Sequence, residues 1–480
     1  MKSEAIIHIH HSNADISYLQ QCLIAISVLI IVCLGQLIIP LWAIVVGPIG
    51  VLIGYLILRN DLYTLICYIG MIIAVKLRVR EVEISPIDIV AGMLMTSILV
   101  SFIIKKSLFP RRTLVPHPLH YLVLLFAFWT VGIALISFIE DKTTFNSLYR
   151  EFLTFSPLIF IPILFNAIVK KNEYDLKYLV RFLFLLWVVE EIASVLYIRQ
   201  SMHAAVFLFQ TGKVAYDVAG NSVMIFTLLS LSTIESQKKY RKYYIIGILI
   251  STLGLLLSMN RTAWLLTLGL APFLLLLTPR SQRKNRNRIV IETLLITLGC
   301  ATLLYFAVPL FQLLMKWFYL KFLTSSNLRT DVSLVNRYIE WRYVIQQILS
   351  TPIGGIGFGG QYKLYGWIGG YTIDSYYTHN GFLGILLKSG IVGFILIFTV
   401  HIKFFIMGVK LSVERILNDK EKALVRTGLF VIILITFHMF TMNPFMQREI
   451  LWYLGLVWSY FIYLEHKVNT YPSELQKTNG

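Results

Sequence analysis

Charged residues are scarce in this 480-residue chain. Asp, Glu, Lys and Arg together make up only 14% of it, against about 25% in an average soluble domain. Hydrophobic residues make up 57%. The composition therefore excludes an ordinary water-soluble protein and predicts one that crosses the membrane several times.

Cysteine is rare as well. The four cysteines lie inside apolar runs, and none has the CxxC spacing of metal or redox sites: Cys22, Cys33, Cys67 and Cys300. They are expected to be small buried hydrophobic side chains.

The sequence shows no internal repeat, which counts mildly against a secondary transporter. Its glycine-rich stretch, residues 354–360, lacks the lysine and serine of a nucleotide-binding loop, so an irregular tight turn is predicted there.

Acidic residues are outnumbered by basic ones, and the formal net charge is +18. The bases lie in short clusters between apolar runs, and the sequence contains no separate basic domain and no DNA- or RNA-binding signature. This pattern is typical of cytoplasmic loops that follow the positive-inside rule. Nucleic acid is therefore rejected as a partner.

Long apolar runs are what the sequence has in abundance. A membrane-spanning helix needs about 20 apolar residues, fewer or more when it is tilted. Lipid offers no partners to backbone groups, and the runs are continuous, without alternation, so helices are predicted. The predicted fold class is an all-α polytopic membrane protein with about 12–14 transmembrane helices. The candidate spans lie near residues 18–35, 37–58, 62–76, 84–104, 118–139, 153–169, 176–198, 217–235, 243–259, 262–278, 289–308, 381–407, 424–441 and 449–465.

Basic clusters between these spans set the predicted orientation. With the N-terminus inside, five clusters become cytoplasmic, at residues 105–112, 170–171, 238–242, 280–288 and 410–426. The cluster at 76–80 then lies outside, as an exception to the rule. The predicted order is a cytoplasmic tail, transmembrane helices 1–11, a large external loop, transmembrane helices 12–14 and a second cytoplasmic tail, over residues 1–17, 18–308, 309–380, 381–465 and 466–480.

The predicted external loop holds most of the polar residues that could do chemistry. Residues 333–349 are predicted to form an amphipathic helix, since its apolar residues recur at three- and four-residue spacing. Polar pairs stand at three points on the same predicted side: Asn260-Arg261, Asn336-Arg337 and His379-Asn380. Arginine suits phosphate and histidine can take a proton near neutral pH. Arg150 lies near the same surface and is a candidate to line a polar cleft.

Each of these residues also has a simpler interpretation. Arg261 can cap a helical hairpin at the membrane interface, Arg337 can pair with Glu340, and His379 can be a helix-start residue bonded to backbone. Glu190 and Glu191 lie in the middle of a predicted span, where acids are functional candidates by default. They form either a proton relay, which carries the alternative hypothesis of a small-solute transporter, or a buried pair with a basic residue such as Arg181.

The ordered set of motifs resembles the O-antigen ligase and polymerase superfamily. Its parts are an external Asn/Ser-Arg turn before an apolar helix, Arg-x-x-x-Trp, Pro-x-x-Gly-x-Gly, and His-Asn-x-x-Leu followed by Gly-x-x-Gly. In this chain they are Asn260-Arg261, Arg337 with Trp341, Pro352-Gly355-Gly357, and His379-Asn380-Leu383 with Gly390 and Gly393. The chain departs from the family pattern at Lys388, where an acidic or small residue is frequent, and at Asn260, where serine is common.

The resemblance implies a GT-C-like helical glycosyltransferase that needs neither metal nor cofactor. An acceptor hydroxyl would displace the lipid diphosphate from an undecaprenyl diphosphate-linked glycan with inversion. By the same resemblance His379 is the base, and Arg261 and Arg337 stabilise the diphosphate charge. The candidate substrate-binding residues are Asn380, Arg150, Asn260, Trp341 and Gly357.

The alternatives differ in the acceptor and in the class of protein. A polymerase of lipid-linked repeat units, in the bacterial cytoplasmic membrane with both termini cytoplasmic, is narrowly preferred. A ligase that transfers glycan to lipid A-core or another acceptor is the closest alternative. The expected partners are the glycan donor, a glycan acceptor and the membrane. A chain-length regulator and a flippase are further candidate partners. The transporter and a structural membrane protein without a site stay open.

Overall fold

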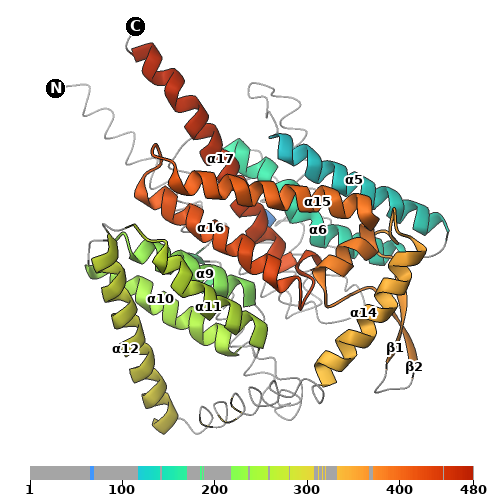
Figure 1. The fold of residues 1–480 in the computed structure, drawn as a ribbon, viewed down its shortest axis with the longest axis horizontal. Coiled ribbons are helices and arrows are strands. Elements are labelled where there is room, and N and C mark those ends of the chain that lie inside the picture. Colours follow the sequence, from blue (N-terminus) through green and yellow to red (C-terminus); the bar gives the residue numbers. More distant parts are fainter. Residues whose placement is uncertain are drawn as a thin grey trace, which may run out of the picture. The chain divides into compact units, whose positions relative to one another are not determined.

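The computed structural model describes most of the chain from residue 117 onward (Figure 1). The described ranges are 117–140, 143–169, 218–235, 238–257, 260–279, 282–307, 332–366, 371–446 and 448–478, with a few positions within 65–69, 184–188 and 312–319. The predicted spans at 18–35, 37–58 and 84–104 lie outside the described residues, as do Glu190, Glu191 and nearly all of 62–76 and 176–198.

The described part of the chain is mostly helical and contains ten α-helices. They are α5 (Pro118–Ile139), α6 (Phe145–Val169), α9 (Val218–Ser232), α10 (Lys238–Leu257), α11 (Arg261–Leu276), α12 (Arg283–Ala307), α14 (Val332–Ser350), α15 (Gly381–Val413), α16 (Asp419–His438) and α17 (Arg448–Thr478). A short 3₁₀ helix, η4 (Pro444–Met446), precedes α17. The amphipathic helix predicted for residues 333–349 is confirmed as α14.

The prediction of an all-α fold is wrong in one detail. Strands β1 (Tyr362–Gly366) and β2 (Tyr371–Ser375) form an antiparallel hairpin in which Tyr362 pairs with Ser375 and Leu364 with Ile373. Side chains alternate along β1, so Tyr362 is buried whereas Lys363 and Tyr365 are exposed. This alternation is hard to recognise in the sequence, because the strand residues lie among glycines and tyrosines. Helix α17 also continues to Thr478, through the predicted tail at 466–480.

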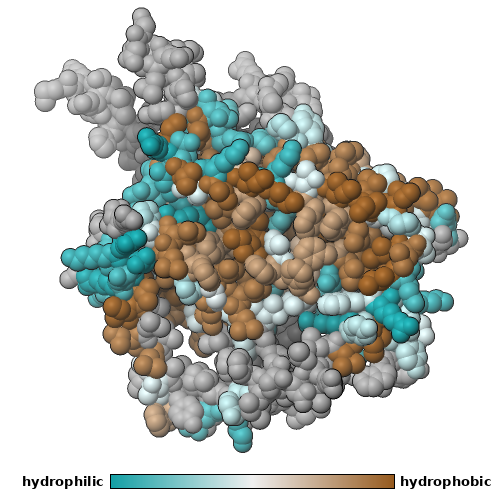
Figure 2. Space-filling view, viewed as in Figure 1, coloured by the Kyte–Doolittle hydropathy of each residue, from teal (hydrophilic) through white to brown (hydrophobic). Residues whose placement is uncertain are grey.

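Two of the described helices are long and apolar enough to cross a membrane, α5 and α15, and two shorter apolar helices lie within α9 and α11. Figure 2 shows an apolar band across the face formed by α5, α15 and α16, with hydrophilic residues gathered at both ends of that face. Large hydrophobic side chains of α5 and α15 are exposed, among them Phe128, Ile139, Ile395 and Ile402. An apolar belt of this extent is what a lipid environment covers.

The chain divides into two compact units, residues 1–115 with 163–186 and residues 116–162 with 187–480. In the second unit, α15 packs along α5, α16 and α17, and α9 packs against α10, α11 and α16. Buried hydroxyls join these helices: Ser222 bonds Thr267 at 2.7 Å, and Thr427 donates to Ser230 at 3.0 Å. Such interhelical bonds suit helices that have lipid around them.

Candidate functional site

The carboxylate of Glu340 in α14 holds His379, the residue two positions before α15. One carboxylate oxygen accepts the backbone N–H of His379 at 2.7 Å, and the other lies 2.7 Å from Nδ1 of its ring. Glu340 is buried, with 6% of its side chain exposed, whereas 49% of the His379 side chain is exposed. The histidine is therefore fixed at its backbone and at one ring nitrogen, and its ring still reaches solvent.

Two tyrosines surround this pair. Tyr377 lies edge-on to the His379 ring, with the ring centroids 5.0 Å apart. The Tyr362 hydroxyl donates to the backbone carbonyl of Tyr377 at 2.9 Å, and the Ser375 hydroxyl donates to the same oxygen at 3.0 Å. Burial raises the pKa of Tyr362 well above its usual value, and the nearby Glu340 carboxylate raises it further. The phenol therefore stays protonated and keeps its donor role.

An apolar cluster ties α14, the hairpin and α15 together beside this pair. Its buried members are Val344, Tyr362 and Leu387, one from each element. Partly buried residues pack around them: Tyr343, Ile348, Ile356, Leu364 and Leu383. Because Val344 lies one helical turn beyond Glu340, the packing that anchors α14 also fixes the carboxylate.

The glycine-rich turn completes an interruption in α15. Gly390 has φ 62° and ψ −168°, so the helix is broken there and its preceding carbonyls lose their usual intrahelical donors. Backbone N–H groups of the turn replace them: Ile356 N donates to Leu387 O at 2.8 Å, and Gly357 N donates to Lys388 O at 2.9 Å. The Trp129 indole donates to Ser389 O at 2.8 Å. The turn therefore satisfies the helix backbone, which confirms the prediction of a tight irregular turn.

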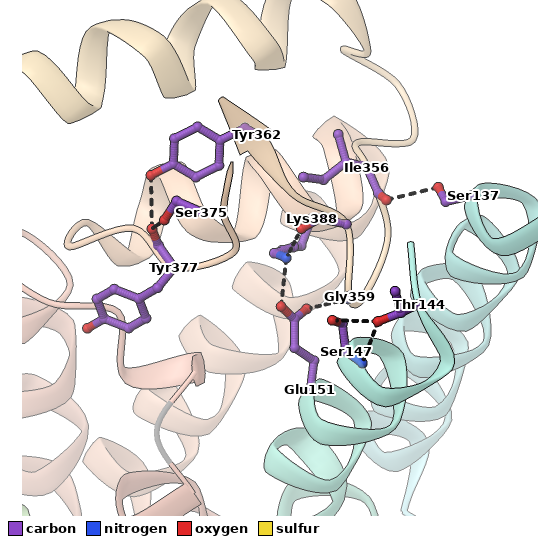
Figure 3. Close-up of polar contacts among 11 residues, drawn as sticks. Ser137, Thr144, Ser147, Glu151, Ile356, Gly359, Tyr362, Ser375, Tyr377 and Lys388 are labelled. Atoms are coloured by element: carbon purple, nitrogen blue, oxygen red, sulfur yellow. Dashed lines mark hydrogen bonds and ion pairs between the residues drawn. The ribbon is translucent and has the colours of Figure 1, made fainter. Parts of the chain in front are cut away.

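A buried ion pair fastens this turn to α6 (Figure 3). Lys388 Nζ lies 2.7 Å from a Glu151 carboxylate oxygen and also donates to Gly360 O at 2.6 Å. The other Glu151 oxygen accepts the backbone N–H of Gly359 at 2.8 Å. Ser137 in α5 donates to Ile356 O at 2.9 Å. The turn is thus held by α5, α6 and α15 together.

The region that contains this site matches a known family. Residues 246–398 match the O-antigen ligase family. This stretch of the chain belongs to the O-antigen ligase family. It contains His379, Glu340, the glycine-rich turn and Lys388, and it covers the motif-bearing region recognised in the sequence. No curated protein matches the chain.

The family assignment gives the coarse function. Members of the O-antigen ligase family are polytopic membrane proteins, and they are glycosyltransferase-type enzymes, ligases or polymerases, that use lipid-linked glycans. The chain is therefore a membrane protein of polysaccharide biosynthesis.

The two asparagines predicted to bind substrate begin helices in the O-antigen ligase domain. Asn380 Oδ1 accepts the N–H of Leu383 at 3.0 Å and caps α15, and Asn260 Oδ1 accepts the N–H of Ala263 at 3.1 Å and caps α11. These bonds explain why asparagine precedes each apolar helix. A role of their amides in substrate binding stays a prediction.

The predicted arginines lie at three different places. Arg337 lies on α14 one turn before Glu340 and is half-buried, and the structure records no ion pair for it with any described residue. Arg261 is the first residue of α11 and Arg150 lies in α6 directly before Glu151, but their side chains are outside the described part. Glu340 binds His379, so the alternative pairing of Arg337 with Glu340 is wrong.

The other two residues predicted to bind substrate, Trp341 and Gly357, lie on α14 and in the glycine-rich turn. Trp341 follows Glu340 on α14, and its buried indole nitrogen has no hydrogen-bond partner among the described atoms. Gly357 has φ 75°, and its N–H is used by α15. Within the described residues, no group of three His, Cys, Asp or Glu side chains is placed to hold a metal ion.

Sequence reasoning missed the acids of this site. In the sequence, spacing indicates Arg337 as the partner of Glu340, and the position of Glu151 between Arg150 and an apolar run does not mark it as a site residue. The sequence does offer one signal. Glu151 is an isolated acid beside an apolar run, and Lys388 is an isolated base inside another apolar run. Only the fold pairs residues that are 237 positions apart.

Proposed function

We propose that the chain is a membrane glycosyltransferase that polymerises undecaprenyl diphosphate-linked oligosaccharide repeat units on the outer face of the cytoplasmic membrane. The observation that carries this proposal is the half-exposed His379, held by a buried Glu340 within the O-antigen ligase domain. A histidine fixed on one side and open on the other is suited to take a proton from an incoming hydroxyl.

The proposed reaction is a direct inverting displacement. A hydroxyl of the acceptor glycan gives its proton to His379 and its oxygen attacks the anomeric carbon of the donor. The bond from that carbon to the diphosphate oxygen breaks, and undecaprenyl diphosphate leaves with the electron pair. Arg337 and Arg261 stabilise the negative charge that grows on the diphosphate. The partial burial of Arg337 without an acidic partner among the described residues supports this role.

We also propose where the site lies, which residues bind substrate and which partners take part. The site lies on the external side, in a loop over residues 309–380 within a GT-C-like bundle of 12–14 spans, with both termini cytoplasmic. Asn380, Arg150, Asn260, Trp341 and Gly357 line the substrate path. The donor and acceptor are glycans, and a chain-length regulator and a flippase are the partners with which such an enzyme would work.

A ligase that transfers the finished glycan to lipid A-core or another acceptor is the second candidate. The match to a family described as O-antigen ligase favours it. Both activities use the same donor and differ in the acceptor alone. The polymerase is preferred narrowly, because the number of predicted spans exceeds the twelve usual in ligases and no sequence feature points to a lipid A acceptor.

The test is a gel profile of surface polysaccharide and of lipid-linked intermediates. It compares the wild type, a deletion strain, and the deletion strain carrying His379→Ala at equal protein level. Surface glycan arrested at a single repeat in both altered strains supports the polymerase. Long chains that accumulate on the lipid carrier without transfer support the ligase. An unchanged profile in the deletion strain, with no redundant copy, rejects both and favours the transporter.

A further inference from the structure

Glu340 holds the histidine in a way that decides which ring nitrogen can act. We propose that Glu340 is a positioning residue that selects the His379 tautomer with its proton on Nδ1, so that the Nε2 lone pair faces the acceptor hydroxyl. The inference rests on the proposed function, because it names how the base of that reaction is prepared. The glutamate itself touches no reacting atom.

The geometry dictates this tautomer. An ionised carboxylate only accepts hydrogen bonds, so the His379 nitrogen 2.7 Å from it must carry a proton. In a neutral imidazole the proton on Nδ1 leaves Nε2 as the acceptor. Among the described residues nothing bonds to Nε2, and the ring is half exposed. The open side of the ring is therefore its basic side.

The same carboxylate also fixes where the ring stands. Its second oxygen binds the backbone N–H of His379, so one side chain sets both the main chain and the ring. The groups that face this pair are Tyr377, edge-on to the ring, and Tyr362, whose phenol is near Glu340. Arg337 stands one turn earlier on α14 and has no acidic partner in the described part. Glu340 is thus the acid that contacts His379 in the described structure.

Glu340 also acts during the proton transfer. When the hydroxyl gives its proton to Nε2, the ring becomes an imidazolium and both its nitrogens carry protons. The buried carboxylate then faces a positive charge at hydrogen-bond distance, and this stabilises the charge that develops. The proton leaves the ring for solvent after undecaprenyl diphosphate departs, which restores the starting state.

A merely structural role would be limited to the bond with the backbone N–H. The Glu340→Gln variant separates the two roles. Its amide oxygen can still accept that N–H, but its NH₂ group then faces Nδ1 and donates to it. This forces the proton onto Nε2 and removes the base. Glu340→Asp keeps the charge and shortens the reach by one methylene. Asp374→Asn, in which an exposed carboxylate on β2 is neutralised, is the matched control.

The experiment measures initial rates with lipid-linked repeat units extracted from the deletion strain, which serve as both donor and acceptor. We expect Glu340→Gln to lower kcat by about 10²- to 10⁴-fold with KM little changed, and Asp374→Asn to behave as the wild type. Glu340→Asp should retain more activity than Glu340→Gln. Equal unfolding temperatures in detergent exclude loss of fold. Wild-type kcat in Glu340→Gln would overturn the inference.

Nitrogen NMR of ¹⁵N-histidine-labelled wild-type protein gives a reading that does not depend on activity or on the folding of any Glu340 variant. The His379 signal is assigned by its absence in His379→Ala, and its shifts report which nitrogen carries the proton. A proton on Nδ1 supports the inference, and a neutral ring protonated on Nε2 rejects it. An active His379→Ala with normal polysaccharide would instead reject the proposed function, so the two failures are distinguishable.

Discussion

Lys388 and Glu151 form a buried ion pair, 2.7 Å long, between α15 and the start of α6. Only 5% and 3% of their side chains are exposed. Each partner also binds the backbone of the glycine-rich turn, Lys388 at Gly360 O and Glu151 at Gly359 N. The pair therefore fixes the turn that completes the broken helix beside His379.

Removal of one partner of this pair should destabilise the protein strongly. Lys388→Met leaves the Glu151 carboxylate buried without its cation, a change that costs about 3–5 kcal/mol for buried pairs. The double variant Lys388→Met with Glu151→Gln leaves no buried charge, and the amide oxygen of its new side chain can still accept the N–H of Gly359. We therefore expect the double variant to be more stable than the single one. Unfolding in detergent, followed by size-exclusion fluorescence, measures both.

This expectation has a clear contrary result. If Lys388→Met unfolds at the wild-type temperature, the pair does not hold the turn. Lys467 and Glu421 form an ion pair of the same 2.7 Å length that is more exposed, so Lys467→Met is the control, and it should change stability by less than about 1 kcal/mol.

Gly357 should not tolerate a side chain. Its φ of 75° disfavours any L-residue, and an added Cβ would lie 2.6 Å from Ala134 Cα. Gly357→Ala is expected to destabilise the protein by at least about 1–3 kcal/mol, because the strain adds to the clash. Gly132→Ala in α5 meets nothing within 4 Å and serves as control. Comparable accumulation of both variants in the membrane would contradict the packing described here.

Helix positions were the part of the fold that the sequence predicted well. Continuous apolar runs predict helices because backbone groups in lipid must be satisfied within the segment. The helix over residues 118–139 was predicted at the residues that form α5. The hairpin was missed because its strands have only five residues each and lie among glycines and tyrosines. Strand pairing of so short a segment is decided by tertiary packing, here of Tyr362 and Leu364 against α14 and α15.

The site was predicted in its residue types but not in its pairing. His379 and Arg337 stood out because polar residues are rare in this chain. Spacing within a helix made Arg337 and Glu340 look like partners. The structure pairs Glu340 with a residue 39 positions away instead, since α14 packs on α15. The interruption at Gly390 was likewise invisible, because a glycine in an apolar run is compatible with an unbroken helix.

Tyr362 should anchor the hairpin through its hydroxyl. Tyr362→Phe removes the Tyr362 hydroxyl, which donates to the carbonyl of Tyr377 together with the Ser375 hydroxyl. We expect a loss of about 0.5–1.5 kcal/mol in stability, the usual worth of one such bond. Tyr365→Phe, on the exposed face of β1, is the matched control and should be neutral. The unfolding temperatures of the two variants test this. An equal loss of stability in both would show that the hydrogen bond of the Tyr362 hydroxyl contributes little.

Arg337 should act on turnover and not on stability. It is half-buried on α14 without an acidic partner in the described residues, so its charge is available to a diphosphate. Arg337→Ala is expected to lower the polymerisation rate by about 10²- to 10³-fold, as for loss of one donor to a developing oxyanion.

Arg342→Ala, on the exposed side of the same helix, is the matched control and should change the rate little. Arg337→Lys should keep only part of the rate, because an ammonium cannot bind two phosphate oxygens as a guanidinium fork does. Rates measured with the lipid-linked repeat unit at equal protein level test this, and equal rates for the two alanine variants would remove Arg337 from the site.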